Sequence, residues 1–213
     1  MLIDAAGTLC VPSESTAAVY KRFGVPFGVT MSEHDILQRF RQAYNTPWTE
    51  TNIRYVGDGR PFWQHIVAQS TDCTSRDLFE EIYTYYSRPE AWHVMPGAKE
   101  ALTKLRNHGV KLAVVSNFDT RLRPLLDGLE LSSLFDEMVV SAEVGAEKPS
   151  PLIFESALLR LGLQPNEVIH VGDDRRNDVW GARDAGISAW LWGTDVTSFD
   201  QVASKILTGD LTI

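Results

Sequence analysis

The stretch VKLAVVSNFD, residues 110–119, contains a short apolar run that ends in a serine and an asparagine. Residues Val110 to Val115 are rich in β-branched side chains, which is typical of a strand covered on both faces. A helical stretch, Ala98 to His108, precedes this run and ends at Gly109. This order of helix, turn and buried strand predicts an α/β protein.

The same alternation continues on both sides of this stretch. Further strands are expected at Glu137 to Val140, Val168 to Val171 and Ser188 to Leu191, with Leu2 and Ile3 as the stub of another. Helices are expected between them, at Thr120 to Leu129, Pro151 to Leu161 and Asp178 to Ala185. Strands that alternate with helices over such short loops predict a Rossmann-like parallel sheet with helices on both faces.

A segment of different composition interrupts this pattern. All six tyrosines lie between Tyr20 and Tyr86, and Lys21 is the only lysine from residue 12 to residue 95. Apolar residues at helical spacing predict helices at Ser13 to Phe23, Ser32 to Tyr44, Arg60 to Gln69 and Thr74 to Tyr86. We therefore expect an α/β core of residues 1–11 and 96–213, with an all-helical cap of residues 12–95 inserted after the first strand.

Charge and composition exclude several classes of protein. The chain has 28 acidic and 20 basic side chains, a net charge of −8, and 44% hydrophobic residues. A globular domain is expected, without a nucleic-acid or membrane surface, because such surfaces need clustered positive charge. The two cysteines form no disulfide framework, and no signal peptide is evident. We expect a cytoplasmic protein, or an organellar one if the N-terminus has been trimmed.

Chemically active side chains follow the predicted strands. Asp4 follows the first strand, Ser116 ends the run at 110–116, Lys148 comes after the third strand, and Gly172-Asp173-Asp174 follows the fourth, with Asp178 close behind. The carboxyl ends of parallel strands meet at one edge of a sheet, where open α/β sheets bind ligands. Carboxylates gathered there need protons or a cation among them, and a set of oxygen donors without histidine or thiolate suits Mg²⁺.

Four motifs in this order resemble the haloacid dehalogenase superfamily of hydrolases across essentially the whole chain. They are Asp4-Ala5-Ala6-Gly7-Thr8-Leu9, Val114-Val115-Ser116-Asn117, Lys148-Pro149, and Gly172-Asp173-Asp174 with Asp178. Phe40-Arg41-Gln42-Ala43-Tyr44 and Ser116-Asn117-Phe118-Asp119 are similar to the branch called haloacid dehalogenase-like hydrolase domain-containing protein, type three. The helical segment resembles the family's cap.

The resemblance implies a Mg²⁺-dependent phosphohydrolase site that acts on a small phosphorylated metabolite. Asp4 would be the nucleophile that forms an aspartyl-phosphate, and Ser116 and Lys148 would bind the phosphoryl oxygens. Thr8, Asn117, Arg41 and Arg60 are the candidate substrate-binding residues. The metal ligands would be Asp4, the backbone carbonyl of Ala6 and Asp173, with Asp174 and Asp178 supporting the site directly or through its ligands.

Ala6 departs from the family pattern. Phosphatases of the family usually carry a second aspartate at this position, which protonates the leaving group and later activates water. Alanine can do neither, and loss of a general acid typically removes about 10²- to 10⁴-fold of rate. A weak or atypical phosphatase is therefore the expected activity.

Other functions stay open. A catalytically impaired relative, or pseudoenzyme, would keep the pocket to bind a phosphorylated ligand or a protein partner. A 2-haloacid dehalogenase is another alternative, because the first motif resembles that of such enzymes and Arg41 lies near the position of their cap arginine. Such an enzyme would not need the acidic fourth motif. A phosphonoacetaldehyde hydrolase needs a cap lysine, for which Lys21 is poorly placed. A monomer or a small homo-oligomer is expected.

Overall fold

Five parallel strands form the central sheet of the computed structural model, which describes residues 1–210. Their order is β5-β4-β1-β6-β7, and every neighbouring pair is parallel. The strands are β1 (Leu2–Ile3), β4 (Ala113–Ser116), β5 (Glu137–Val140), β6 (Ile169–Gly172) and β7 (Ser188–Leu191). The predicted α/β class with a Rossmann-like parallel sheet is confirmed.

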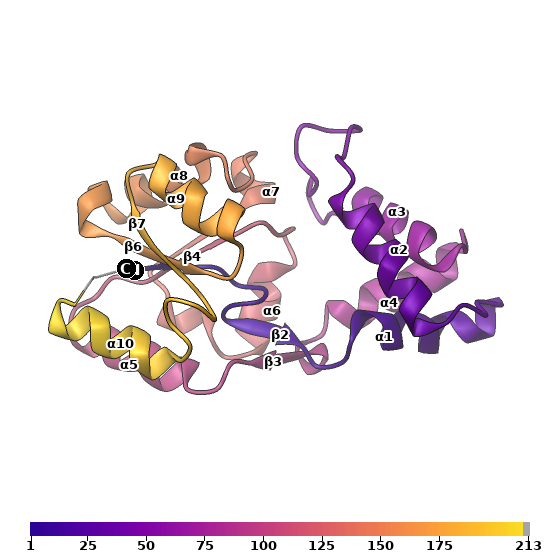
Figure 1. Cartoon of the computed structure of the whole chain (residues 1–213), viewed down its shortest axis with the longest axis horizontal. Coiled ribbons are helices and arrows are strands. Elements are labelled where there is room, and N and C mark those ends of the chain that lie inside the picture. Colours follow the sequence, from indigo (N-terminus) through magenta and orange to yellow (C-terminus); the bar gives the residue numbers. More distant parts are fainter. Residues whose placement is uncertain (211–213) are drawn as a thin grey trace.

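Helices cover both faces of this sheet (Figure 1). In the view of Figure 1, α8 (Pro151–Leu161) and α9 (Gly181–Asp184) lie above the sheet, and α5 (Ala98–Asn107) and α10 (Phe199–Thr208) lie below it. Because side chains alternate along a strand, Leu2 packs on the upper side in a cluster with residues of α8. Ile3 packs on the lower side with residues of α5 and α10.

Shorter helices complete the α/β part of the chain. They are α6 (Leu122–Gly128), α7 (Ser141–Val144), the π-helical segment η5 (Arg175–Trp180) and the 3₁₀ helices η3 (Ser132–Leu134) and η4 (Pro165–Glu167). The helix predicted at 178–185 is thus two segments, η5 followed directly by α9. Neither α7 nor α10 was predicted from the sequence.

Four helices form a second layer of structure beside the sheet. They are α1 (Thr16–Gly24), α2 (Glu33–Asn45), α3 (Arg60–Thr71) and α4 (Arg76–Tyr86), with the 3₁₀ helices η1 (Val25–Phe27) and η2 (Pro89–Ala91). They bury their own apolar cluster, which includes Tyr20, Ile36, Leu78 and Ile82. The predicted starts are corrected for two of them: the caps of α1 and α4 are Ser15 and Ser75, whose side chains accept hydrogen bonds from backbone amides.

The chain leaves and re-enters the α/β part through a small ribbon. Strand β2 (Cys10–Pro12) pairs antiparallel with β3 (Trp92–Val94), and Pro12 lies opposite Trp92. The ribbon therefore holds the two connections to the helices α1–α4 side by side. The boundaries at residues 12 and 95 stay a prediction, but the ribbon lies beside both of them.

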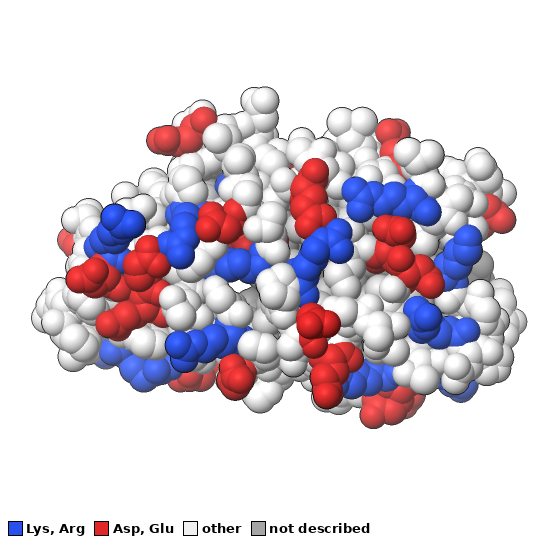
Figure 2. Space-filling view, turned by 180° about the vertical axis from the view of Figure 1, so that it is seen from behind, with Lys and Arg blue, Asp and Glu red and all other residues white. Residues whose placement is uncertain are grey.

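The surface carries charges of both signs. Figure 2 shows acidic and basic side chains interspersed over one face of the molecule, without a broad patch of a single sign. Within residues 1–210, the structure contains no helix with the length and apolarity needed to cross a bilayer.

Candidate active site

Asp4 lies at the carboxyl end of the central strand. Its backbone N–H donates to the carbonyl of Val171 on β6 at 2.9 Å, so the chain is still held by the neighbouring strand when it reaches this residue. The Asp4 side chain is buried. The strand β1 is flanked by β4 and β6, whose own ends carry Ser116 and Gly172. The sheet order thus brings the predicted catalytic residues Asp4 and Ser116, which is also buried, to one edge.

Lys148 joins two of the carboxylates. Its Nζ lies 2.6 Å from Oδ1 of Asp4, 2.6 Å from Oδ1 of Asp178 and 3.0 Å from the carbonyl oxygen of Val115. Burial by itself would lower the pKa of this ammonium group, but the charges of Asp178 and Asp4 outweigh burial and raise it. Lys148 therefore stays positively charged between two carboxylates.

Asn117 holds the loop that carries Lys148. Its side-chain Nδ2 donates to the carbonyl of Lys148 at 2.9 Å, and its Oδ1 accepts from the Lys148 backbone N–H at 2.7 Å. Both ends of the amide are engaged in this clamp. We predicted Asn117 as a substrate-binding residue, and the structure gives its side chain a positioning role.

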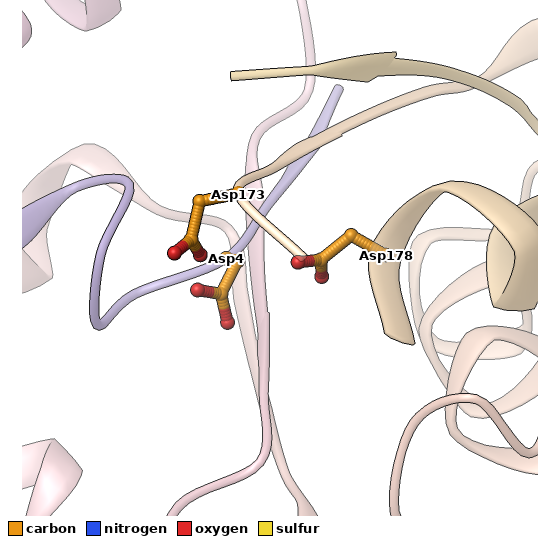
Figure 3. A group of neighbouring side chains, drawn as sticks. All are labelled: Asp4, Asp173 and Asp178. Carbon is orange, nitrogen blue, oxygen red and sulfur yellow. The ribbon is translucent and has the colours of Figure 1, made fainter. Parts of the chain in front are cut away.

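Three carboxylates converge at the same edge. One oxygen each from Asp4, Asp173 and Asp178 lies within 4.8 Å of the other two (Figure 3). Figure 3 shows the three side chains pointing toward one another from different segments. Thr8, predicted to bind substrate, donates from Oγ1 to Oδ1 of Asp173 at 3.3 Å. Burial and the charge of Asp178 raise the pKa of Asp173.

The two carboxylates that Lys148 binds differ in acidity. Burial raises the pKa of Asp4 to about 6, against the opposing effect of Lys148. Burial acts on Asp178 in the same direction, but Lys148 and His170 together hold its pKa below the ordinary value. His170 Nε2 lies 2.9 Å from Oδ1 of Asp178 and must donate, because an ionised carboxylate only accepts.

Two glycines make room for the carboxylates. A Cβ atom on Gly7, whose φ is +99°, would lie 2.4 Å from Oδ2 of Asp173. A Cβ atom on Gly172 would lie 2.1 Å from Cγ of Asp178. The backbone is thus shaped to let both acids approach Asp4. Three crowded carboxylates, of which Asp4 and Asp178 are buried and Asp173 is exposed, offer oxygen donors that fit Mg²⁺.

Asp174 does not join this cluster. Its Oδ1 accepts from the backbone N–H groups of Arg176 and Asn177, both at 2.8 Å, so its carboxylate caps η5 and is exposed. Its own N–H donates to Oδ2 of Asp178 at 3.0 Å. The structure therefore places Asp174 as a residue that orients Asp178, and it separates the carboxylate from the predicted metal ligands.

The two predicted cap arginines also lie apart from the carboxylates. Arg41 is exposed on α2. Arg60 forms ion pairs with Asp58 at 3.0 Å and with Glu80 at 2.5 Å, and its guanidinium lies 4.3 Å from the centre of the Tyr83 ring. The sequence alone could not show that Arg60 has partners within its own layer of helices.

A cavity of about 210 Å³ lies between the helices and the sheet edge. Ala6, Asn117 and Phe118 line it on the side of the sheet. Aromatic residues of the helical segment and of β3 make most of the remaining wall: Tyr20, Phe40, Tyr44, Tyr55, Trp63, Phe79, Tyr83, Tyr86 and Trp92. The concentration of tyrosines in the segment was visible in the sequence, but their convergence on one cavity was not.

A buried ion pair on the loop after β4 connects the two layers. Asp119 and Arg121 are bidentate, with Nη2 2.6 Å from Oδ2 and Nε 2.8 Å from Oδ1. Trp63 of α3 donates from Nε1 to Oδ2 of Asp119 at 2.9 Å, and the N–H of Thr120 donates to the carbonyl of Gly57 at 3.0 Å. Asp119 and Arg121 were not predicted as residues of the site. Their only sequence signal is that they follow Ser116-Asn117.

Comparisons with known proteins agree with this geometry. A sequence model described as haloacid dehalogenase-like hydrolase matches residues 1–186. Haloacid dehalogenase-like hydrolase domain-containing protein 3 from Mus musculus is 34% identical over 176 residues, which cover 77% of this chain and 69% of the mouse protein.

Two further relatives represent different reactions. A protein named phosphoserine phosphatase, from Thermus thermophilus, is 31% identical over 186 residues, covering 84% of this chain and 72% of that protein. The structure of L-2-haloacid dehalogenase from Xanthobacter autotrophicus is similar with a TM-score of 0.70 at 21% identity, covering 99% of this chain and 83% of that one. The second likeness establishes the fold alone. With the family match over residues 1–186, the chain belongs to the haloacid dehalogenase-like hydrolases.

Proposed function

We propose that this hydrolase is a phosphatase that works through an aspartyl-phosphate on Asp4. The observation that carries the proposal is the position of Lys148, whose Nζ lies 2.6 Å from both Asp4 and Asp178. This ammonium group keeps a buried carboxylate charged and adds a positive charge where phosphoryl oxygens would gather. The sequence relative named as a phosphatase supports the same assignment.

The reaction would take place in two displacements. An oxygen of Asp4 attacks phosphorus, and the bond from phosphorus to the leaving-group oxygen breaks with its electron pair on that oxygen. Water then attacks the phosphorus of the aspartyl-phosphate, which releases inorganic phosphate and restores the carboxylate. Lys148 and the Ser116 hydroxyl would bind the phosphoryl oxygens in both steps.

Mg²⁺ is part of the proposal. Asp4, Asp173, the carbonyl of Ala6 and, directly or through its neighbours, Asp178 would hold it. When bound, the ion neutralises negative charge on the phosphoryl group and its acceptor. Asp174 would contribute by fixing Asp178 through its backbone N–H, which donates at 3.0 Å.

A hydrolysis assay with acetyl phosphate tests the proposal. Acetate leaves without being protonated, so the absence of an acid at residue 6 does not slow the first displacement. We expect Mg²⁺-dependent phosphate release by the wild type and none by Asp4→Asn. The matched control is Asp127→Asn, an exposed aspartate on α6, which should keep full activity. A wild type that is inactive with Mg²⁺, or Asp4→Asn that is as active as the wild type, would contradict the proposal.

Ala6 favours one second candidate, a protein that binds a phosphorylated ligand without turning it over. This function needs the same Lys148 and carboxylate cluster but no group at residue 6. It predicts that inorganic phosphate with Mg²⁺ raises the melting temperature while acetyl phosphate stays intact. Turnover that disappears in Asp4→Asn would decide against it.

A further inference from the structure

We propose that the aromatic cavity holds the leaving group of the substrate, and that the substrates are therefore aryl phosphate monoesters. This inference rests on the proposed phosphatase function and adds a substrate class to it. Four properties of the cavity support it: its position, its size, the chemistry of its wall and the residue at its junction with the active-site loop.

The cavity begins where the nucleophile loop ends. Ala6, two residues beyond Asp4, and Asn117, the residue after Ser116, both line it. A phosphoryl group placed between Asp4 and Ser116 would therefore have its ester oxygen and the attached group on the side of the cavity. The rest of the wall comes mostly from the helices α1–α4, which face this edge of the sheet.

Its size suits one substituted ring. The volume is about 210 Å³. An engineered protein cavity of about 150 Å³ with an apolar lining binds benzene, so the present volume accommodates a phenyl ring with a substituent or a small bicycle.

The wall favours a flat apolar group. Phe40 stacks on Tyr44 with ring centres 5.7 Å apart and meets Tyr20 edge to face at 5.9 Å. Such walls recognise a ring by burial and by offset or edge-on contacts. The Tyr86 hydroxyl is buried, and the Thr16 side chain is its hydrogen-bonding neighbour. This hydroxyl is a candidate donor to a substituent on the ring.

Among the described residues that line the cavity, Arg121 is the one cation, and its charge is already neutralised. All three nitrogens of the Arg121 guanidinium are engaged: Nε and Nη2 by Asp119, and Nη1 by the carbonyl of Tyr83 at 3.2 Å and Oγ of Ser87 at 3.3 Å. A leaving group with a carboxylate would find no free positive partner here, and burying it without one is costly. The wall therefore disfavours zwitterionic leaving groups such as serine.

The chemistry of Ala6 leads to the same class. Alanine cannot protonate the departing oxygen, so the leaving group must be stable as an anion. A phenol, with a pKa of about 10, meets this need far better than an alkyl alcohol, whose acidity is close to that of water at about 15.7. The aromatic wall of the cavity and the absence of an acid at Ala6 thus favour the same substrates for independent reasons.

Phosphonate binding separates recognition of the ring from its reactivity as a leaving group. Benzylphosphonate places a ring at the distance of a phenyl ester but cannot be hydrolysed, and ethylphosphonate is its short alkyl counterpart. With Mg²⁺ present, we expect benzylphosphonate to bind about tenfold more tightly or better, because only it buries a ring. Calorimetry or thermal shift measures this without any turnover. Equal affinities would overturn the proposal.

A variant that fills the cavity tests its location. Thr16 lines the cavity at the start of α1, and Thr16→Phe would occupy part of the volume. We expect the preference for benzylphosphonate to fall about tenfold toward that of ethylphosphonate. Thr84→Phe, on an exposed position of α4, is the matched control and should keep the preference. A preference that Thr16→Phe leaves intact would show that the ring binds elsewhere, and would overturn the proposal.

Turnover completes the test. We expect kcat/KM for phenyl phosphate to exceed that for glycerol 3-phosphate and phosphoserine, and the ratio of phenyl to acetyl phosphate to fall in Thr16→Phe. If acetyl phosphate is not hydrolysed, the proposed function fails while the phosphonate result still reports on the cavity. If acetyl phosphate is hydrolysed but phosphoserine exceeds phenyl phosphate, the substrate class is wrong and the phosphatase stands.

Discussion

Ala6 is the residue on which the rate of the proposed reaction depends. We expect Ala6→Asp to supply the missing acid and to accelerate hydrolysis of alkyl phosphates by about 10²- to 10⁴-fold. Acetyl phosphate should gain less, because acetate needs no proton to leave and only the activation of water would improve. The ratio of kcat for the two substrates in wild type and variant checks this, and an equal gain on both would contradict a role in protonating the leaving group. The partial exposure of Ala6 leaves room for the larger side chain.

Cys10 should be chemically inert in spite of its position near the active site. Its side chain is buried, and burial together with the charge of Asp4 raises the pKa of the thiol to about 12. Because the thiolate is the reactive form, the thiol is unreactive below that pH. We expect one equivalent of a thiol reagent to label the native protein at about pH 8, at the partly exposed Cys73, and two equivalents after unfolding. Fast labelling of both in the native state would contradict this.

At the scale of elements, the turn after β1 can be tested through its glycine. Gly7→Ala should destabilise the protein by about 1–3 kcal/mol through backbone strain and should also weaken Mg²⁺ binding, because its Cβ would displace Asp173. Gly28→Ala is a matched control, since Gly28 also has a positive φ, of +82°, but nothing lies within 4 Å of its Cβ. Urea unfolding and Mg²⁺ titration distinguish the two. If both variants bound Mg²⁺ with similar affinity, Gly7 would be needed only for the backbone conformation of the turn and not for the position of Asp173.

The loop after β4 ties the helices to the sheet through Asp119 and Arg121. The Asp119 side chain is 1% exposed, and Asp119→Ala leaves Arg121 and Trp63 without their partner. Removing one member of a buried ion pair costs about 3–5 kcal/mol. Glu143→Ala breaks the bidentate pair with Arg123, which is much more exposed, and should cost about 1 kcal/mol or less. If urea unfolding showed that Asp119→Ala and Glu143→Ala lose comparable free energies of unfolding, the buried pair would not be structurally important.

Helices and strands could be predicted from the sequence where a short apolar run or a capping residue marks them. The strands at 137–140 and 188–191 match β5 and β7 because they are short apolar runs. The ribbon β2–β3 was missed, because its three-residue strands are recognisable only as a pair and lie about 80 residues apart in the sequence. The helix α10 was also missed, although it follows the predicted strand at 188–191 and its capping residue, Ser198, is a recognisable helix start.

At the scale of the whole molecule, metal should link the active site to stability. Crowded carboxylates oppose folding, so a bound cation should raise the free energy of unfolding, by about 2.7 kcal/mol at a concentration of 100 times its Kd. Asp173→Asn should lose this gain, while the metal-free variant is at least as stable as the metal-free wild type because one of three mutually repelling charges is gone. Melting temperatures with Mg²⁺ and with EDTA check this. An unchanged wild-type melting temperature would remove support for the site.

The group of active-site residues at the edge of the sheet could be predicted from the sequence, but the aromatic cavity beside it could not. Asp4, Ser116, Lys148 and Asp173 could be placed because they follow strands, and parallel strands end together. The roles of Arg41, Arg60 and Asp174 depend on which partners lie nearby, and spacing along the chain carries no such information. For the same reason Asp119 and the aromatic wall emerged only from the packing of the helices on the sheet.

The ribbon β2–β3 also bears on how such a chain can diversify. Pro12 and Trp92 are cross-strand neighbours, so the whole stretch between them begins and ends at one point of the scaffold. An inserted segment with this property can be exchanged for another of different length or chemistry without moving a strand of the central sheet. The nucleophile belongs to the α/β part of the chain, and the aromatic wall belongs to the inserted segment. Selectivity and reaction chemistry can therefore evolve, or be engineered, as separate parts of one gene.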